Sequence, residues 1–126
     1  MATERRENTR MLCSELVDVG WKERSGHRQR ASANLEDISL SGVCLQVDHP
    51  IPLGTELRID HPKGEFQGTV RYCLFLETGY FLGVEFAPGF KWSPEDYQPQ
   101  HLLDLRTLVT RSAQRTIQEP GEEPAP

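Results

Sequence analysis

The sequence has no long apolar run, which excludes a conventional transmembrane helix. No apolar stretch approaches the ~18 residues that such a helix needs. The first ten residues are polar and charged and hold no apolar segment of a secretory signal. We therefore expect a cytoplasmic protein without membrane insertion.

Cysteine is scarce, which argues against both a disulfide framework and a metal site. The three cysteines are Cys13, Cys44 and Cys73, an odd number without a C-x-x-C pair, which predicts free thiols in a reducing compartment. The four histidines are scattered and add no metal-ligand spacing. No serine lies in a G-x-S-x-G context. We expect no metal, no cofactor and no enzymatic activity.

A surplus of positive charge is also missing. The chain has 14 basic and 19 acidic residues, a net charge of -5, which disfavours a partner such as long nucleic acid. Half of the basic residues nevertheless lie in the first 30 positions, and the residues after Ile117 include three glutamates and no base. A locally basic start on an acidic chain favours a small anionic ligand.

Hydrophobic alternation predicts an all-β domain. A chain of 126 residues has the size of one domain. Apolar residues alternate with polar ones in short segments that turn formers separate at intervals of 8–12 residues, typical of a small antiparallel barrel or sandwich. The six expected strands contain residues 17–21, 31–35, 43–47, 57–59, 66–72 and 80–86, and strand-like sequence begins at Met11.

The chain ends have a different composition. Leu102, Leu105 and Val109 fall at helical spacing, so we expect an amphipathic helix over 99–112, with Ser93-Pro94 as a helix start. Residues 1–10 form a flexible, arginine-bearing arm in this interpretation. Residues 11–115 form the barrel with its helix, and residues 116–126 form a disordered tail.

Two short motifs carry the candidate binding chemistry. Arg6 and Arg10 each offer a planar fork of donors that fits phosphate or the Hoogsteen edge of guanine. Asp37, Ser39 and Gly42 lie between two expected strands. An ionised Asp accepts the N–H donors of guanine, and Gly permits a left-handed backbone or a close approach of ligand. Alone, each motif also suits a solvated arm or an Asx turn.

In order along the chain, these motifs resemble the PilZ domain family. Arg6-x-x-x-Arg10 matches its R-x-x-x-R motif and Asp37-x-Ser39-x-x-Gly42 its D-x-S-x-x-G motif. Further agreement lies in the segments 52–57, 68–71 and 80–86. The resemblance implies a six-stranded barrel with a C-terminal helix, and binding of the bacterial second messenger cyclic di-GMP.

The resemblance also implies roles for single residues. Arg6 and Arg10 would grip phosphate and guanine, with Arg5 as a secondary helper. Asp37 and Ser39 would read a guanine, and Gly42 would keep the turn open. Strand alternation gives expectations for Arg71 and for the aromatic residues. Arg71 points to ligand or only to solvent, and four aromatic residues fill the barrel: Trp21, Phe66, Tyr72 and Phe86.

We therefore expect a non-catalytic cyclic di-GMP receptor, present as a monomer or weak dimer. Ligand would order its arm, and the protein would then signal to an unidentified downstream protein. The alternative is a degenerate PilZ-like adaptor that binds proteins and no nucleotide. A single-stranded nucleic-acid binder of the OB type is a third possibility, which the charge of -5 disfavours.

Overall fold

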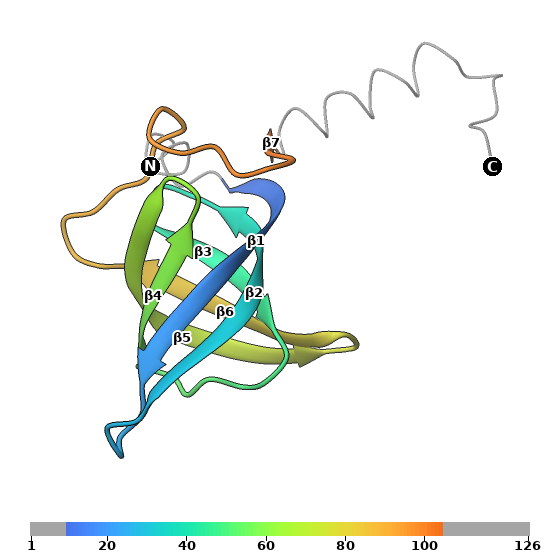
Figure 1. Cartoon of the computed structure of the whole chain (residues 1–126). Coiled ribbons are helices and arrows are strands. Elements are labelled where there is room, and N and C mark those ends of the chain that lie inside the picture. The colour runs from blue at the N-terminus through green and yellow to red at the C-terminus, as the bar shows by residue number, and fades with distance from the viewer. Residues whose placement is uncertain (1–9, 105–126) are drawn as a thin grey trace, which may run out of the picture.

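Six antiparallel strands close into a barrel (Figure 1) in the computed structural model, which describes residues 10–104. The order around the barrel is β2-β3-β6-β5-β4-β1, and pairing of β1 with β2 closes it. A short seventh strand extends the sheet beside β1. The strands are β1 (Met11–Lys22), β2 (Arg28–Ile38), β3 (Gly42–Val47), β4 (Glu56–His61), β5 (Gly64–Leu76), β6 (Gly79–Phe86) and β7 (Leu103–Asp104). All six predicted strands are confirmed, as a barrel and not a sandwich.

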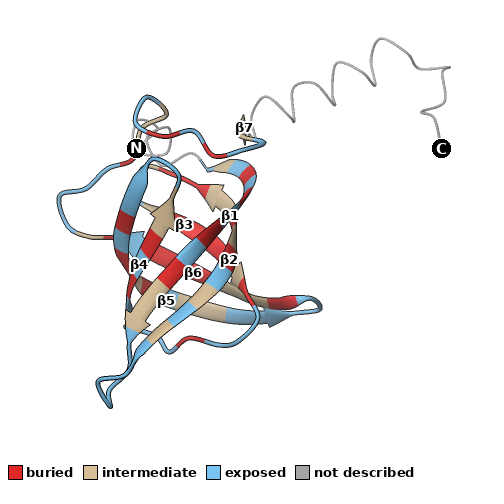
Figure 2. Ribbon diagram, in the orientation of Figure 1, coloured by how far each residue is buried: buried red, intermediate tan, exposed pale blue. Residues whose placement is uncertain are grey.

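Alternate residues of each strand point inward and form one core (Figure 2). Leu35, Leu45, Ile59 and Leu82 are completely buried, and they come from four different strands. Cys13 and Cys44 are buried, the third cysteine is half-buried, and all three are free thiols. The β5–β6 hairpin projects from the barrel (Figure 1). On it, Leu74–Leu76 are exposed.

The predicted C-terminal helix is wrong over its first part. Residues 99–104 form a turn and then β7, which pairs with the start of β1; the rest of the predicted helix, 105–112, lies outside the described residues. Ser93 begins a single turn, closed by the Asp96 N–H, and no helix follows it as far as Asp104, where the described residues end. No helix among residues 10–104 is long and apolar enough to cross a membrane. Residues 1–9 of the arm predicted over 1–10, and the predicted tail of residues 116–126, also lie outside the described part.

Residues 97–101 depart from a helix because residues of β1 form hydrogen bonds with their polar groups. The buried Glu15 carboxylate accepts hydrogen bonds from the Tyr97 hydroxyl and the Gln100 N–H, both at 2.9 Å. The Ser14 N–H donates to the Gln100 carbonyl at 3.0 Å, and His101 adopts a left-handed backbone with φ of 60°. These tertiary bonds favour a turn and a strand over a helix across residues 99–104.

We expect Glu15→Ala to lower the free energy of unfolding by about 2–3 kcal/mol, because it leaves the Tyr97 hydroxyl and the Gln100 N–H without their acceptor. Urea denaturation would measure the change. Glu23→Ala, at an exposed position of the β1–β2 turn, is the control and should unfold like the parent. Equal midpoints for the two variants would mean that Glu15 does not hold this segment.

Candidate functional site

An irregularity in β2 turns Asp37 out of the barrel. The register against β3 passes from Leu35↔Leu45 to Asp37↔Cys44, so β2 contains one extra residue, Glu36. Such a β-bulge changes which side chains face the core. Leu35 and Ile38 are both completely buried although they stand three positions apart, and Asp37 between them is only partly buried.

A second bulge, in β5, does the same for Tyr72. Pairing with β6 passes from Val70↔Val84 to Tyr72↔Gly83, which leaves Arg71 as the extra residue. Val70 and Cys73 pack on the core, again three positions apart. Arg71 is exposed and Tyr72 is half-exposed, with its ring against Gly83; a Cβ at Gly83 would overlap that ring. The prediction that Tyr72 fills the barrel is therefore wrong, whereas Phe66 and Phe86 do belong to the core and Trp21 packs at its edge.

The two bulges border one hollow of about 280 Å³ on the outside of the barrel. Its lining comes from Arg10, from the end of β2, from the β2–β3 connection, and from β3, β5 and β6. The lining residues are Arg10, Asp37, Ser39, Ser41, Gly42, Val43, Cys44, Arg71, Tyr72, Gly83, Val84 and Glu85.

Asp37 is the least exposed charge of this hollow. Its side chain is 16% exposed, and the only ion pair that residues 10–104 offer it is with Arg10, whose Nη1 lies 4.0 Å from Asp37 Oδ2 and whose side chain is 59% exposed. Burial raises the pKa of Asp37 above its usual value, Arg10 lowers it, and Glu36 raises it. A carboxylate held at this energetic cost gains from any further donor that reaches it.

Arg71 and Glu85 form the second charge pair of the hollow. Arg71 Nε donates to Glu85 Oε1 at 2.8 Å, and both side chains are more than half exposed. An exposed pair of this kind contributes little stability. The Arg71 side chain can therefore change partner at small cost when an anion arrives.

Ser39 and Gly42 shape the connection between β2 and β3. The Ser39 N–H donates to the Gly42 carbonyl at 2.9 Å, and the buried Ser39 hydroxyl donates to the same oxygen at 3.4 Å. Gly42 is not in the left-handed region. A Cβ there would collide with the Val84 carbonyl, so its glycine is required by the close approach of β6 and not by a positive φ.

Cys44 contributes a neutral thiol beside Asp37. The Tyr72 hydroxyl hydrogen bonds to its sulfur. Burial, followed by the nearby Asp37 charge, raises the pKa of Cys44 to about 11, so the thiol is protonated at neutral pH. Cys44 and Tyr72 thus form an uncharged floor next to the carboxylate.

The structure brings together four of the predicted site residues: Arg10, Asp37, Ser39 and Gly42. Arg71, whose role the sequence left open, lies at the same hollow, and Arg5 and Arg6 lie outside the described residues. Sequence reasoning missed seven further lining residues: Ser41, Val43, Cys44, Tyr72, Gly83, Val84 and Glu85. Only Gly83 gave a usable signal, because a glycine inside a strand often marks a close approach.

Comparison with known proteins agrees with this fold. The family model described as PilZ domain matches residues 4–111. Among solved structures, the chain is similar to the crystal structure of YcgR in complex with c-di-GMP from Escherichia coli, with a TM-score of 0.52 and 16% sequence identity. The alignment covers 91% of this chain and 50% of that one, so the chain spans about half the length of its structural neighbour. No curated protein matches.

The raised pKa of Asp37 predicts an effect of pH on stability. Because the folded pKa lies above the unfolded value, the ionised carboxylate destabilises the fold at neutral pH; that cost disappears as the pH falls through the folded pKa towards the unfolded one. Asp37→Asn should therefore unfold at a higher urea concentration than the parent at pH 7, and the difference should shrink in acid. A variant less stable than the parent at pH 7 would contradict this electrostatic account.

Proposed function

Because the chain belongs to the PilZ domain family, we propose that it is a non-catalytic receptor that binds cyclic di-GMP in the hollow between Arg10 and Asp37. One observation carries this proposal. Arg10 and Asp37, which belong to the two different motifs and are separated by 27 positions in the sequence, lie at the same hollow, with Arg10 Nη1 4.0 Å from Asp37 Oδ2.

The chemistry of the hollow matches a guanine next to a phosphate. The Asp37 carboxylate only accepts hydrogen bonds, and the Watson–Crick edge of guanine presents adjacent N–H donors. Donation to Asp37 would compensate the burial of its charge. Arg10 is exposed and can turn from Asp37 to a phosphate or to the Hoogsteen edge of the same base.

The balance of charge in the hollow indicates that a ligand with two phosphates needs further arginines, which Arg5 and Arg6 would supply. Among its described residues, the positive charges of Arg10 and Arg71 are balanced by the negative charges of Asp37 and Glu85. The hollow therefore has no surplus of positive charge to neutralise the two phosphates of cyclic di-GMP. Arg6 precedes Arg10 by four positions, which an extended chain covers within roughly 14 Å. We propose that Arg6, with Arg5 as helper, supplies the missing positive charge and that ligand fixes residues 1–10 over the hollow.

The proposed output is contact with a downstream protein. Leu74–Leu76 follow the bulge on β5, and each of these residues is more than half exposed. A contiguous exposed apolar segment is typical of an interaction surface. The same segment would serve the alternative function, an adaptor that binds protein but no nucleotide, and the titration below separates the two.

Arg6→Ala and Arg10→Ala should each weaken cyclic di-GMP binding by about 2–5 kcal/mol, because each removes a charge-assisted contact. Isothermal titration calorimetry at fixed salt measures the affinity, with GTP and GMP as competing ligands. Lys63→Ala is the control, since Lys63 is exposed and lies outside the hollow.

Melting temperatures of the variants should stay close to that of the parent. If both arginine variants bind as the parent does, these residues do not hold the ligand. If the parent binds no cyclic di-GMP at all, the adaptor becomes the better account.

A further inference from the structure

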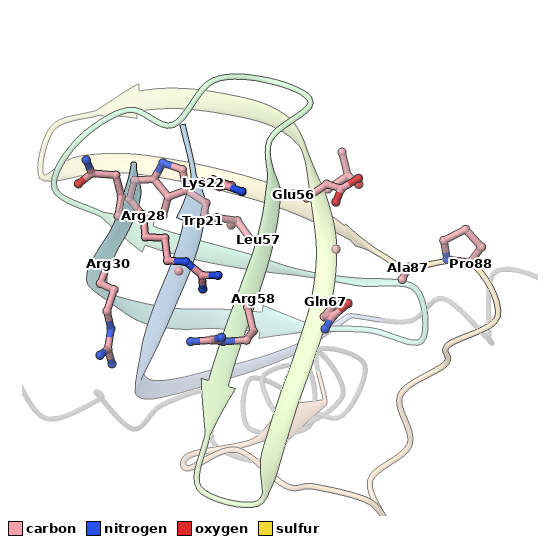
Figure 3. A pocket seen from close by; sticks show the side chains of 14 residues that line it. Trp21, Lys22, Arg28, Arg30, Glu56, Leu57, Arg58, Gln67, Ala87 and Pro88 are labelled. Atoms are coloured by element: carbon pink, nitrogen blue, oxygen red, sulfur yellow. The ribbon is translucent and has the colours of Figure 1, made fainter. Parts of the chain in front are cut away.

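A larger cavity lies at the other end of the β1–β2 ladder (Figure 3). Its volume is about 570 Å³, and it shares no lining residue with the hollow at Arg10 and Asp37. The twelve positions from Arg10 to Lys22 correspond to roughly 40 Å along β1. Pairing of β1 with β4 ends at Gly20↔Arg58, and the cavity lies where the two strands then separate.

The lining of this cavity is strongly basic although the chain is acidic. Its only acidic residue is Glu56, within a chain of net charge -5. The basic residues are Lys22, Arg28, Arg30 and Arg58 (Figure 3). This surplus of three positive charges contrasts with the balanced charges of the hollow.

The strand register places like charges next to one another. Lys22 and Arg28 are direct partners in the β1–β2 ladder, an arrangement that destabilises a sheet. Gly20 pairs with Arg30 on one side and with Arg58 on the other, so no side chain separates the two arginines. Arg58 Nη2 lies 3.7 Å from the position that a Cβ of Gly20 would take. An anion above Gly20 would relieve this repulsion.

Most of these cations have no acidic partner within residues 10–104. Arg58 Nε lies 3.4 Å from Asp60 Oδ1, in a pair that is well exposed. Lys22, Arg28 and Arg30 take part in no ion pair in that part of the chain. Their donors therefore face solvent or a ligand.

We propose that this cavity binds a phosphorylated small molecule of nucleotide size, at a site separate from that for cyclic di-GMP. Clustered guanidinium forks are suited to phosphate, and about 570 Å³ is in the range of small-ligand sites. The half-buried Trp21 lines the same cavity and offers a flat apolar surface to a ring. The concave shape and the net charge of -5 favour a small ligand over a polymer or a membrane surface.

Titration of the ¹⁵N-labelled chain with ATP, and separately with inorganic tripolyphosphate, tests the proposal by NMR. ATP should shift the Trp21 indole N–H and the amides of 20–22 and 28–30 in a saturable way. The Trp92 indole is an internal reference, because it is buried and donates to the Tyr97 carbonyl at 2.8 Å. Tripolyphosphate should shift the same amides.

Arg28→Glu combined with Arg30→Glu should weaken ATP binding by about tenfold or more. The double variant should still fold, since Arg28→Glu gives Lys22 an opposite charge as partner. Lys63→Glu combined with Lys91→Glu makes the same change of charge at exposed positions outside both cavities and should leave the affinity nearly unchanged.

Three results would overturn the proposal: shifts that do not saturate, equal weakening by both double variants, or shifts centred on Gly42 and Gly83. Because the readout lies at the far end of β1, failure here leaves the cyclic di-GMP proposal standing. Failure of cyclic di-GMP to bind would likewise leave this site untouched.

Discussion

Two β-bulges, at Glu36 in β2 and at Arg71 in β5, are the constraint on which the candidate site depends. In a regular strand, Asp37 would share the inward face with Leu35, and Tyr72 would share it with Val70. The extra residue in each strand places Ile38 and Cys73 in those inward positions instead. Asp37, Arg71 and Tyr72 are thereby gathered on the outside of an intact barrel, as is common for bulges beside functional sites.

Close packing of the strands then holds this arrangement in place. Gly42 lets β3 approach the Val84 carbonyl, and Gly83 leaves room for the Tyr72 ring. The Tyr72 hydroxyl and the Cys44 thiol are hydrogen-bonded to each other beside Asp37. A preorganised acceptor loses less conformational entropy on binding, which would suit the proposed receptor.

The sequence was sufficient to predict much of the fold because alternation with period two survives along most of each strand. Val17 and Val19 in β1, or Leu82 and Val84 in β6, face the core as their spacing indicates. The first part of the helix expected over 99–112, residues 99–104, is wrong for a tertiary reason. Glu15, distant in sequence, accepts the hydrogen bonds of Tyr97 and Gln100, and β1 pairs with β7.

The site was predictable only in part. Arg10, Asp37, Ser39 and Gly42 could be found because they form short motifs. Tyr72 could not, because a bulge inserts one residue into β5 without any marker in the sequence, and every inference from alternation beyond it changes face. Glu85 faces outward as alternation in β6 indicates, but only the pairing of β6 with β3 and β5 brings it to the hollow. The basic cavity at Lys22 and Arg28 was also invisible, since those residues become neighbours only through the register of β1 and β2.

The most direct test of the central claim is an NMR titration of the ¹⁵N-labelled chain with cyclic di-GMP, which locates the ligand. The account predicts saturable shifts at Gly42, at Gly83 and at the amides of residues 4–10, with the Trp21 indole unchanged. Shifts confined to the end of β1 near Trp21, or a spectrum that cyclic di-GMP leaves unaltered, would contradict it.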